Sequence, residues 1–214
     1  TVDAGRLQRA KKAGVLQKID NPFLKERIPA SLRDRENFWF GLSQRARTII
    51  YNKGTLDASK LSTYEDLASP TWKGQLCIRS SDSVYNQSLV ASMIEVNGID
   101  KTESWARGLV QNFARPPTGG DTDLLKATAA GQCSIALANT YYLGRLINSK
   151  INSERNAAKN LKVFWPNQGD GDRGVHVNVS GAGITKYARN INEALSLLEF
   201  LVTDESQKWY AEVN

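Results

Sequence analysis

The sequence predicts an α/β fold built on a parallel sheet. Two strand-then-helix units follow one another: a strand over 75–79 precedes a helix over 84–96, and a strand over 133–138 precedes a helix that starts at Leu143. Strands that alternate with helices form parallel sheets with right-handed crossovers. A long β-branched and aromatic passage over 38–52 indicates a strand that crosses between lobes. A chain of 214 residues is long enough for one large domain or two small lobes.

Apolar periodicity and capping residues place the other elements. Further helices are expected over 3–13, 64–68, 102–112, 123–130, 193–202 and 205–213, with Asp121 or Thr122 as the cap before 123 and Asn192 as the cap before 193. Further strands are expected over 163–166 and 175–181, and polar connections over 21–37 and 148–160.

Charge and hydropathy exclude two classes of partner. The net charge is +6, but Lys and Arg are scattered and the longest basic run is Lys11-Lys12. Nucleic-acid binding would require a concentrated basic patch, so no nucleic-acid partner is expected. No apolar run approaches the roughly 18 residues that a membrane-spanning helix needs, and the first residues do not resemble a signal peptide. An anionic small ligand or an acidic partner fits the charge.

The two cysteines leave two alternatives open. Cys77 and Cys133 lie in or beside predicted strands, and each precedes a tyrosine, Tyr85 or Tyr141, by eight residues. They are either two buried free thiols, since Cys packs as a small hydrophobe, or a disulfide between neighbouring strands. A disulfide would indicate an oxidising compartment.

The sequence does not favour an enzyme. The single histidine, His176, lies in a predicted strand without a nearby carboxylate, and a structural, hydrogen-bonded role is the expected one. Nucleophile, phosphate-binding and zinc-protease motifs are absent. The aspartate spacing over 167–174 is similar to that of a calcium loop, but the later bidentate Glu is missing, which disfavours calcium.

Three tyrosines are the candidate metal ligands. Tyr85 follows one predicted strand, and Tyr141 and Tyr142 follow another. Phenolate oxygen is a hard anionic ligand, and a highly charged cation such as Fe(III) can lower a phenol pKa of about 10 far enough to bind it at neutral pH. Softer metals would prefer Cys or His, which are scarce here. From spacing alone, tyrosines packed in a cleft wall are the alternative.

Segments along the whole chain resemble the periplasmic ferric-ion-binding proteins, the substrate-binding components of iron(III) ABC importers, and are most similar to their marine and cyanobacterial branch. The tyrosine pair with the upstream tyrosine is the most specific of these segments. They are Val2-Asp3-Ala4-Gly5-Arg6-Leu7, 41–47, Trp72-Lys73-Gly74-Gln75-Leu76-Cys77-Ile78-Arg79, Val84-Tyr85-Asn86, 117–121, Asn139-Thr140-Tyr141-Tyr142, Phe164-Trp165-Pro166-Asn167-Gln168 and 176–181.

The resemblance implies a type II periplasmic-binding-protein clamp of two α/β lobes with parallel sheets. Residues 1–47 would form part of the first lobe and end in the crossing strand, 48–170 the second lobe with the tyrosine-bearing units, and 171–214 the return to the first lobe. The clamp would close on ferric iron held by Tyr85, Tyr141 and Tyr142 in the interlobe cleft. A periplasmic protein, monomeric at full length, would then hand the ion to an ABC permease in the inner membrane.

The family pattern also extends beyond both ends of this sequence. Family members begin with a strand and a loop, often bearing a further His or Tyr ligand, before the segment that starts at Val2, and they continue after 210–214. We therefore expect a fragment with an incomplete first lobe.

Two arginines are candidates for balancing phenolate charge. Arg145 follows the tyrosine pair by about one helical turn, so it can turn toward the phenolates. Arg45, on the crossing strand, is the second candidate, and either could hold a synergistic anion such as carbonate. The alternative function is a binding protein for another anion or small organic solute, which would use the arginines and helix N-termini instead of the tyrosines.

Overall fold

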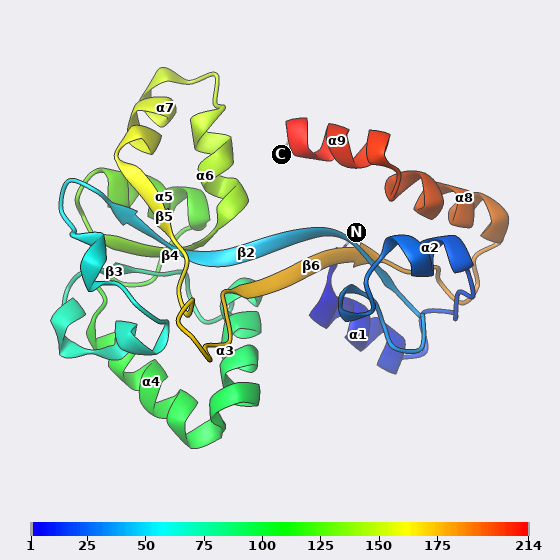
Figure 1. Ribbon diagram of the computed structural model, residues 1–214, viewed down its shortest axis with the longest axis horizontal. Helices are drawn as coiled ribbons and strands as arrows, with labels where there is room; N and C mark the ends of the chain where they lie inside the picture. The colour runs from blue at the N-terminus through cyan, green and yellow to red at the C-terminus, as the bar shows by residue number, and fades with distance from the viewer. Residues whose placement is uncertain (1, 214) are drawn as a thin grey trace. The chain divides into compact units, whose positions relative to one another are not determined.

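The computed structural model describes residues 2–213. The chain divides into unit 1, Thr1–Arg45 with Asn178–Asn214, and unit 2, Ala46–Val177. It passes between the units twice, within β2 (Phe40–Asn52) and within β6 (His176–Ala182), as Figure 1 shows. Within the passage over 38–52, β2 is one continuous strand from Phe40 to Asn52.

Unit 2 is organised around a mixed sheet. β4 (Ile135–Asn139) runs parallel to β3 (Leu76–Cys77) and antiparallel to β2. β5 (Leu161–Phe164) pairs antiparallel with β2. The parallel pairing expected from the two strand-then-helix units thus holds for β3 and β4, and the sheet is mixed because β2 runs in the opposite direction to β4.

Helices cover both faces of this sheet (Figure 1). Side chains alternate along β2 and β4, so that Ile49 and Leu137 join one hydrophobic cluster and Ile50 and Ala136 join the other. The first cluster is covered by α3 (Val84–Asn97) and α4 (Ile99–Gln111), and the second by α5 (Asp121–Ala129), α6 (Thr140–Ile147) and α7 (Asn152–Lys159). Unit 2 is therefore a three-layer α/β/α domain.

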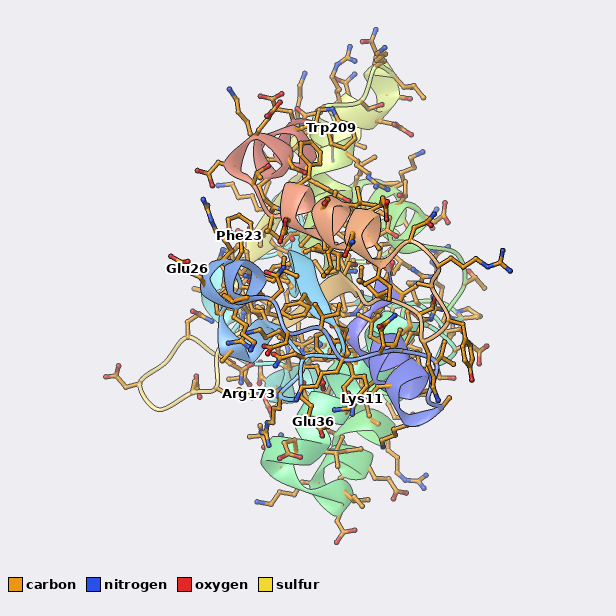
Figure 2. All side chains as sticks on the ribbon, turned by 90° about the vertical axis from the view of Figure 1, so that its right-hand side faces the viewer. Lys11, Phe23, Glu26, Glu36, Arg173 and Trp209 are labelled. Atoms are coloured by element: carbon orange, nitrogen blue, oxygen red, sulfur yellow. A yellow bond between two sulfur atoms is a disulfide. The ribbon has the colours of Figure 1, made fainter. Side chains whose placement is uncertain are left out.

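Unit 1 combines helices with two strands and the first part of β2. β1 (Val2–Asp3) pairs antiparallel with β6, and the helices are α1 (Ala4–Lys12), α2 (Pro22–Arg27), α8 (Ile191–Leu201) and α9 (Asp204–Val213). The backbones of β6 and β2 approach so closely that a Cβ on Gly181 would lie 2.3 Å from the Phe40 carbonyl oxygen, which explains the glycine. The side chains of Phe23 and Trp209 lie on the surface of this unit (Figure 2).

Short 3₁₀ helices connect these elements at Ala30–Leu32, Ala58–Lys60, Glu65–Ala68 and Pro70–Trp72. The turn at Glu65–Ala68 replaces the α-helix expected over 64–68. Its N-cap is Tyr64, and the hydroxyl of the preceding Thr63 accepts a hydrogen bond from the Asp66 N–H.

Two stretches expected to be polar connections contain helices. In the first, Asn21 accepts a hydrogen bond from the Leu24 N–H and Pro22 occupies the first turn, so α2 forms around the buried Leu24. In the second, α7 is polar on most of its surface and buries Ala158. Each helix buries a single apolar residue, so neither shows the apolar periodicity from which helices were predicted.

Two helix caps also differ from expectation. α5 starts at Asp121 with Gly120 as its N-cap, so neither Asp121 nor Thr122 is the cap, and the Asp123 carboxylate accepts from the Gly120 N–H instead. α8 starts at Ile191, so Asn192 lies inside the helix.

Cys77 and Cys133 form a disulfide, which decides between the two alternatives. Their Cα atoms are 5.9 Å apart, and the side chains are 1% and 3% exposed. The bond joins β3 to a residue two positions before β4 begins and therefore ties together the two strands that precede the tyrosines.

Removing this disulfide is expected to destabilise the protein strongly. For cysteines 56 positions apart, the chain-entropy relation gives about 4 kcal/mol of lost unfolding free energy. Urea denaturation of the Cys77→Ala/Cys133→Ala variant beside wild type measures it. A midpoint unchanged between the two proteins would contradict the prediction.

Tyr64 links the backbones of the two crossing strands inside unit 2. Its buried hydroxyl donates to the Arg47 carbonyl and accepts from the His176 N–H at 3.1 Å. Burial raises the pKa of this phenol to about 12. The neutral phenol is thus the form that the fold stabilises.

Tyr64→Phe is expected to lower the free energy of unfolding at pH 8 by about 2 kcal/mol, because a buried carbonyl and N–H lose their partner. The folded-state pKa of Tyr64 lies above the unfolded value, so the phenol's contribution is complete below a pH of about 10 and is lost as the pH rises toward about 12. The stability difference between wild type and variant should therefore shrink over this interval in denaturation experiments. A constant difference would contradict the prediction.

Candidate metal centre

Three tyrosines lie at the starts of two helices in unit 2. Tyr85 is the second residue of α3, and Tyr141 and Tyr142 are the second and third residues of α6. α3 follows β3 and α6 follows β4, and these two strands are parallel, so both helices start at the same edge of the sheet. The carboxyl ends of parallel strands are where α/β proteins bind ligands.

The structure brings the three predicted ligands together. The hydroxyl oxygens of Tyr85 and Tyr141 are 3.1 Å apart, although the residues are 56 positions apart in sequence. The ring centroids of Tyr141 and Tyr142 are 4.3 Å apart, with the planes tilted by 31°. Three phenol rings from two helices therefore converge on one place.

The start of α6 differs from the sequence expectation. The helix begins at Thr140 and not at Leu143, because β4 ends at Asn139, whose backbone N–H donates to the buried Asp121 carboxylate at 2.8 Å. Tyr141 and Tyr142 consequently belong to the first helical turn, and Arg145 follows one turn later.

The environment favours the neutral phenols of Tyr141 and Tyr142 by raising the pKa of each. Burial is the largest cause that raises the pKa of Tyr141, and the neighbouring hydroxyls of Tyr142 and Tyr85 raise it further. Burial also raises the pKa of Tyr142. Phenols that resist ionisation so strongly need a cation of high charge before they become anionic ligands.

Arginines surround the three rings. The guanidinium carbon of Arg145 lies 5.2 Å from the Tyr141 ring centroid and 5.7 Å from that of Tyr142. The guanidinium carbons of Arg79 and Arg47 lie 5.2 Å and 5.8 Å from the Tyr85 ring centroid. These are cation–π distances, and the same positive charges would stabilise phenolates.

The structure places the two predicted arginines differently. Arg145 joins the tyrosines, as described. Arg45 belongs to unit 1, where one nitrogen is 3.0 Å from the Asp3 carboxylate and another donates to the Ser180 hydroxyl at 2.8 Å.

Sequence reasoning missed the charged groups under the tyrosines. Arg47 and Asp121 are 2% and 0% exposed, and their side chains form an ion pair at 3.2 Å. Arg79 lies 3.6 Å from the other oxygen of Asp121. A signal for Arg47 was present, because a charge beside the apolar run from Ile49 to Tyr51 needs a buried partner.

Other metal sites find no support between residues 2 and 213. That part of the chain contains no group of three or more His, Cys, Asp or Glu side chains that could hold an ion, and the loop over 167–174 is no exception. His176 has the expected structural role, with its Nε2 2.9 Å from the Ser88 hydroxyl. Over the same residues, no helix has the length and apolar character needed to cross a bilayer.

Comparison with known proteins identifies similar chains along the whole sequence. The family model described as bacterial extracellular solute-binding protein matches residues 1–214. Iron uptake protein A1 of Synechocystis is 47% identical over 214 residues, which are 100% of this chain and 59% of that protein. Iron uptake protein A2 of the same organism is 46% identical over 214 residues, 62% of its length. The chain thus spans about three fifths of these curated relatives.

Solved structures of similar proteins superpose closely on this chain. FutA of Trichodesmium, in complex with iron and citrate, superposes with a TM-score of 0.94 at 53% identity, over 99% of this chain and 66% of that one. The ferric binding protein of Campylobacter jejuni gives 0.92 at 40% identity, over 96% of this chain and 65% of that one. The predicted α/β fold of the type II periplasmic binding proteins is therefore confirmed. The chain belongs to the family of bacterial extracellular solute-binding proteins.

Proposed function

We propose that the protein binds ferric iron through Tyr85, Tyr141 and Tyr142. The observation that carries this proposal is the convergence of the three phenols, with 3.1 Å between the hydroxyl oxygens of Tyr85 and Tyr141. The similar proteins named as iron uptake proteins and ferric binding proteins support it.

The chemistry of the donor set favours Fe(III) over other metals. Phenolate is a hard ligand, and three phenolates balance the formal charge of a 3+ ion. Because the pKa values of Tyr141 and Tyr142 are raised, a weakly polarising divalent ion gains less from this site than a trivalent one. Carbonate or citrate could complete the coordination, and citrate accompanies iron in the Trichodesmium structure.

Arg145 is the proposed partner of such an anion. Its guanidinium lies against the rings of both Tyr141 and Tyr142, next to the place where an anion bound to the metal would sit. The predicted role of Arg45, to balance phenolate charge or hold an anion, stays a prediction. In unit 1 its guanidinium contacts Asp3 and Ser180.

The biological role that follows is transport and not catalysis. We infer a periplasmic iron carrier that delivers the ion to a membrane ABC permease. The family match to extracellular solute-binding proteins supports this role, as does the disulfide, which suits an oxidising compartment.

Tyrosine-to-phenylalanine variants test the ligands. Wild type is expected to develop a visible tyrosinate-to-iron charge-transfer band on addition of ferric citrate. We expect a weaker band and an iron affinity lower by at least about tenfold in each of the variants Tyr85→Phe, Tyr141→Phe and Tyr142→Phe. Each substitution removes one ligand and leaves one positive charge of the ion unbalanced. Tyr187→Phe is the matched control, because Tyr187 is 85% exposed.

Titration of the same variants with other solutes separates ferric-iron binding from the alternative function. Phosphate and spermidine, titrated by calorimetry, should give no binding that depends on the three tyrosines. An unchanged band in all three phenylalanine variants would contradict the ligand assignment.

Iron binding is expected to release at least about two protons per ion, because the neutral phenols of Tyr141 and Tyr142 must each lose a proton to become ligands. The raised pKa values of Tyr141 and Tyr142 keep both protonated at neutral pH in the iron-free protein. Apparent affinity should therefore fall as the pH is lowered from 9 to 7. The plot of its logarithm against pH should be less steep by about one for Tyr141→Phe than for wild type. Equal slopes in the two proteins would contradict this prediction.

A further inference from the structure

A buried ion pair lies under the tyrosine cluster, and iron ligation does not account for it. Arg47 is 2% exposed and Asp121 is 0% exposed. Removing two charges from water costs several kcal/mol per ion, and well-packed apolar residues often stabilise a fold equally well. Stability alone is therefore a weak explanation for this pair. Its hydrogen-bond contacts indicate a different role.

The guanidinium of Arg47 donates hydrogen bonds to both tyrosine-bearing strand–helix segments of unit 2. One terminal nitrogen donates to the Asn86 side-chain oxygen at 2.6 Å and to the Leu137 carbonyl at 3.0 Å. The other donates to Asp121 at 3.2 Å and to the Asn139 side-chain oxygen at 3.3 Å. Asn86 follows Tyr85 directly, and Asn139 precedes Tyr141 by two residues.

The carboxylate of Asp121 fixes the point at which β4 becomes α6. The oxygen that pairs with Arg47 also accepts the Asn139 backbone N–H at 2.8 Å. That hydrogen bond holds the last residue of β4, so it determines where the first turn of α6, which carries Tyr141 and Tyr142, begins.

Asn86 extends the network on the other side. Its side-chain nitrogen donates to the carbonyls of Arg79 and Ser80 at 2.8 Å and 3.1 Å. The loop between β3 and α3 is thus held to the first turn of α3, where Tyr85 lies. Tyr64 holds the backbone carbonyl of Arg47 from below.

We propose that Arg47 and Asp121 are a positioning pair for the tyrosine ligands: together they fix the distance between the α3 turn that carries Tyr85 and the α6 turn that carries Tyr141 and Tyr142. The pair does not touch the metal. It acts through Asn86 and Asn139, as residues behind metal ligands orient those ligands and tune their affinity. This inference rests on the proposed ferric site.

Two conservative variants test the pair. Arg47→Lys keeps the charge but loses the fork that reaches Asn86 and Asp121 simultaneously. Asp121→Asn keeps the shape but removes the charge. Each is expected to lower iron affinity by about 10- to 100-fold, measured by competition with citrate, and to shift the maximum of the charge-transfer band.

Asp34→Asn is the matched control. Asp34 is also a buried carboxylate, 5% exposed, that pairs with a cation, Lys11 at 2.9 Å, and accepts a backbone N–H, from Phe38 at 3.1 Å. It lies in unit 1, where Lys11 also contacts Glu36, and Figure 2 labels both side chains. The control should lower thermal stability while affinity and band stay at wild-type values.

Hydrogen exchange in the iron-free proteins gives a readout that does not depend on iron. Arg47→Lys and Asp121→Asn should accelerate exchange of the amides from Asn139 to Tyr142 by at least about tenfold, and Asp34→Asn should not. If either variant fails to fold, Asn86→Ala replaces it, since it breaks the link to α3 and leaves the ion pair intact.

The possible outcomes are distinguishable. Wild-type affinity, band and exchange in Arg47→Lys and Asp121→Asn would overturn the positioning pair while the ferric site stands. Absence of a band in wild type would overturn the ferric site, and the exchange rates would then decide the positioning role alone: accelerated exchange from Asn139 to Tyr142 supports it, and unchanged exchange refutes it.

Discussion

The parallel pairing of β3 with β4 is the constraint on which the candidate metal centre depends. Leu76 lies opposite Ile135 and Cys77 opposite Ala136, so the two strands begin at the same level of the sheet and run in the same direction toward the tyrosine-bearing helices. The disulfide from Cys77 to Cys133 secures the same register covalently. Because each strand leads into a helix whose first turn carries tyrosine, the register of two short strands determines whether three phenols meet. A slip of one residue would turn the side chains to the opposite face.

Electrostatics then determine what such a cluster can bind. Burial and mutual contact favour neutral phenols, as the raised pKa values of Tyr141 and Tyr142 indicate. The three guanidiniums of Arg47, Arg79 and Arg145 near the rings outnumber the one carboxylate of Asp121. An iron-free cluster is therefore cationic, and it disfavours weakly charged cations that cannot displace phenolic protons.

Much of this centre could be predicted from the sequence, because its parts are local. Tyr85, Tyr141 and Tyr142 each follow a recognisable strand, and Arg145 follows the pair at helical spacing. The parts that escaped prediction depend on distant partners. Asp121 resembles an N-cap by its neighbours, yet its carboxylate bonds to Arg47 and Asn139, 74 and 18 positions away. The early start of α6 and the disulfide are likewise fixed by contacts across the sheet, which local patterns do not encode.

The cationic character of the cluster also bears on how iron would arrive. A bare trivalent ion is repelled by the surrounding guanidiniums, whereas iron carried by an anion presents negative charge to them. Arg145 lies against two of the three proposed ligands and is in position to meet that anion as the phenols lose their protons. Binding by three tyrosinates would balance the formal charge of a 3+ ion. The surrounding arginines would therefore select the delivered complex, and the tyrosines the ion within it.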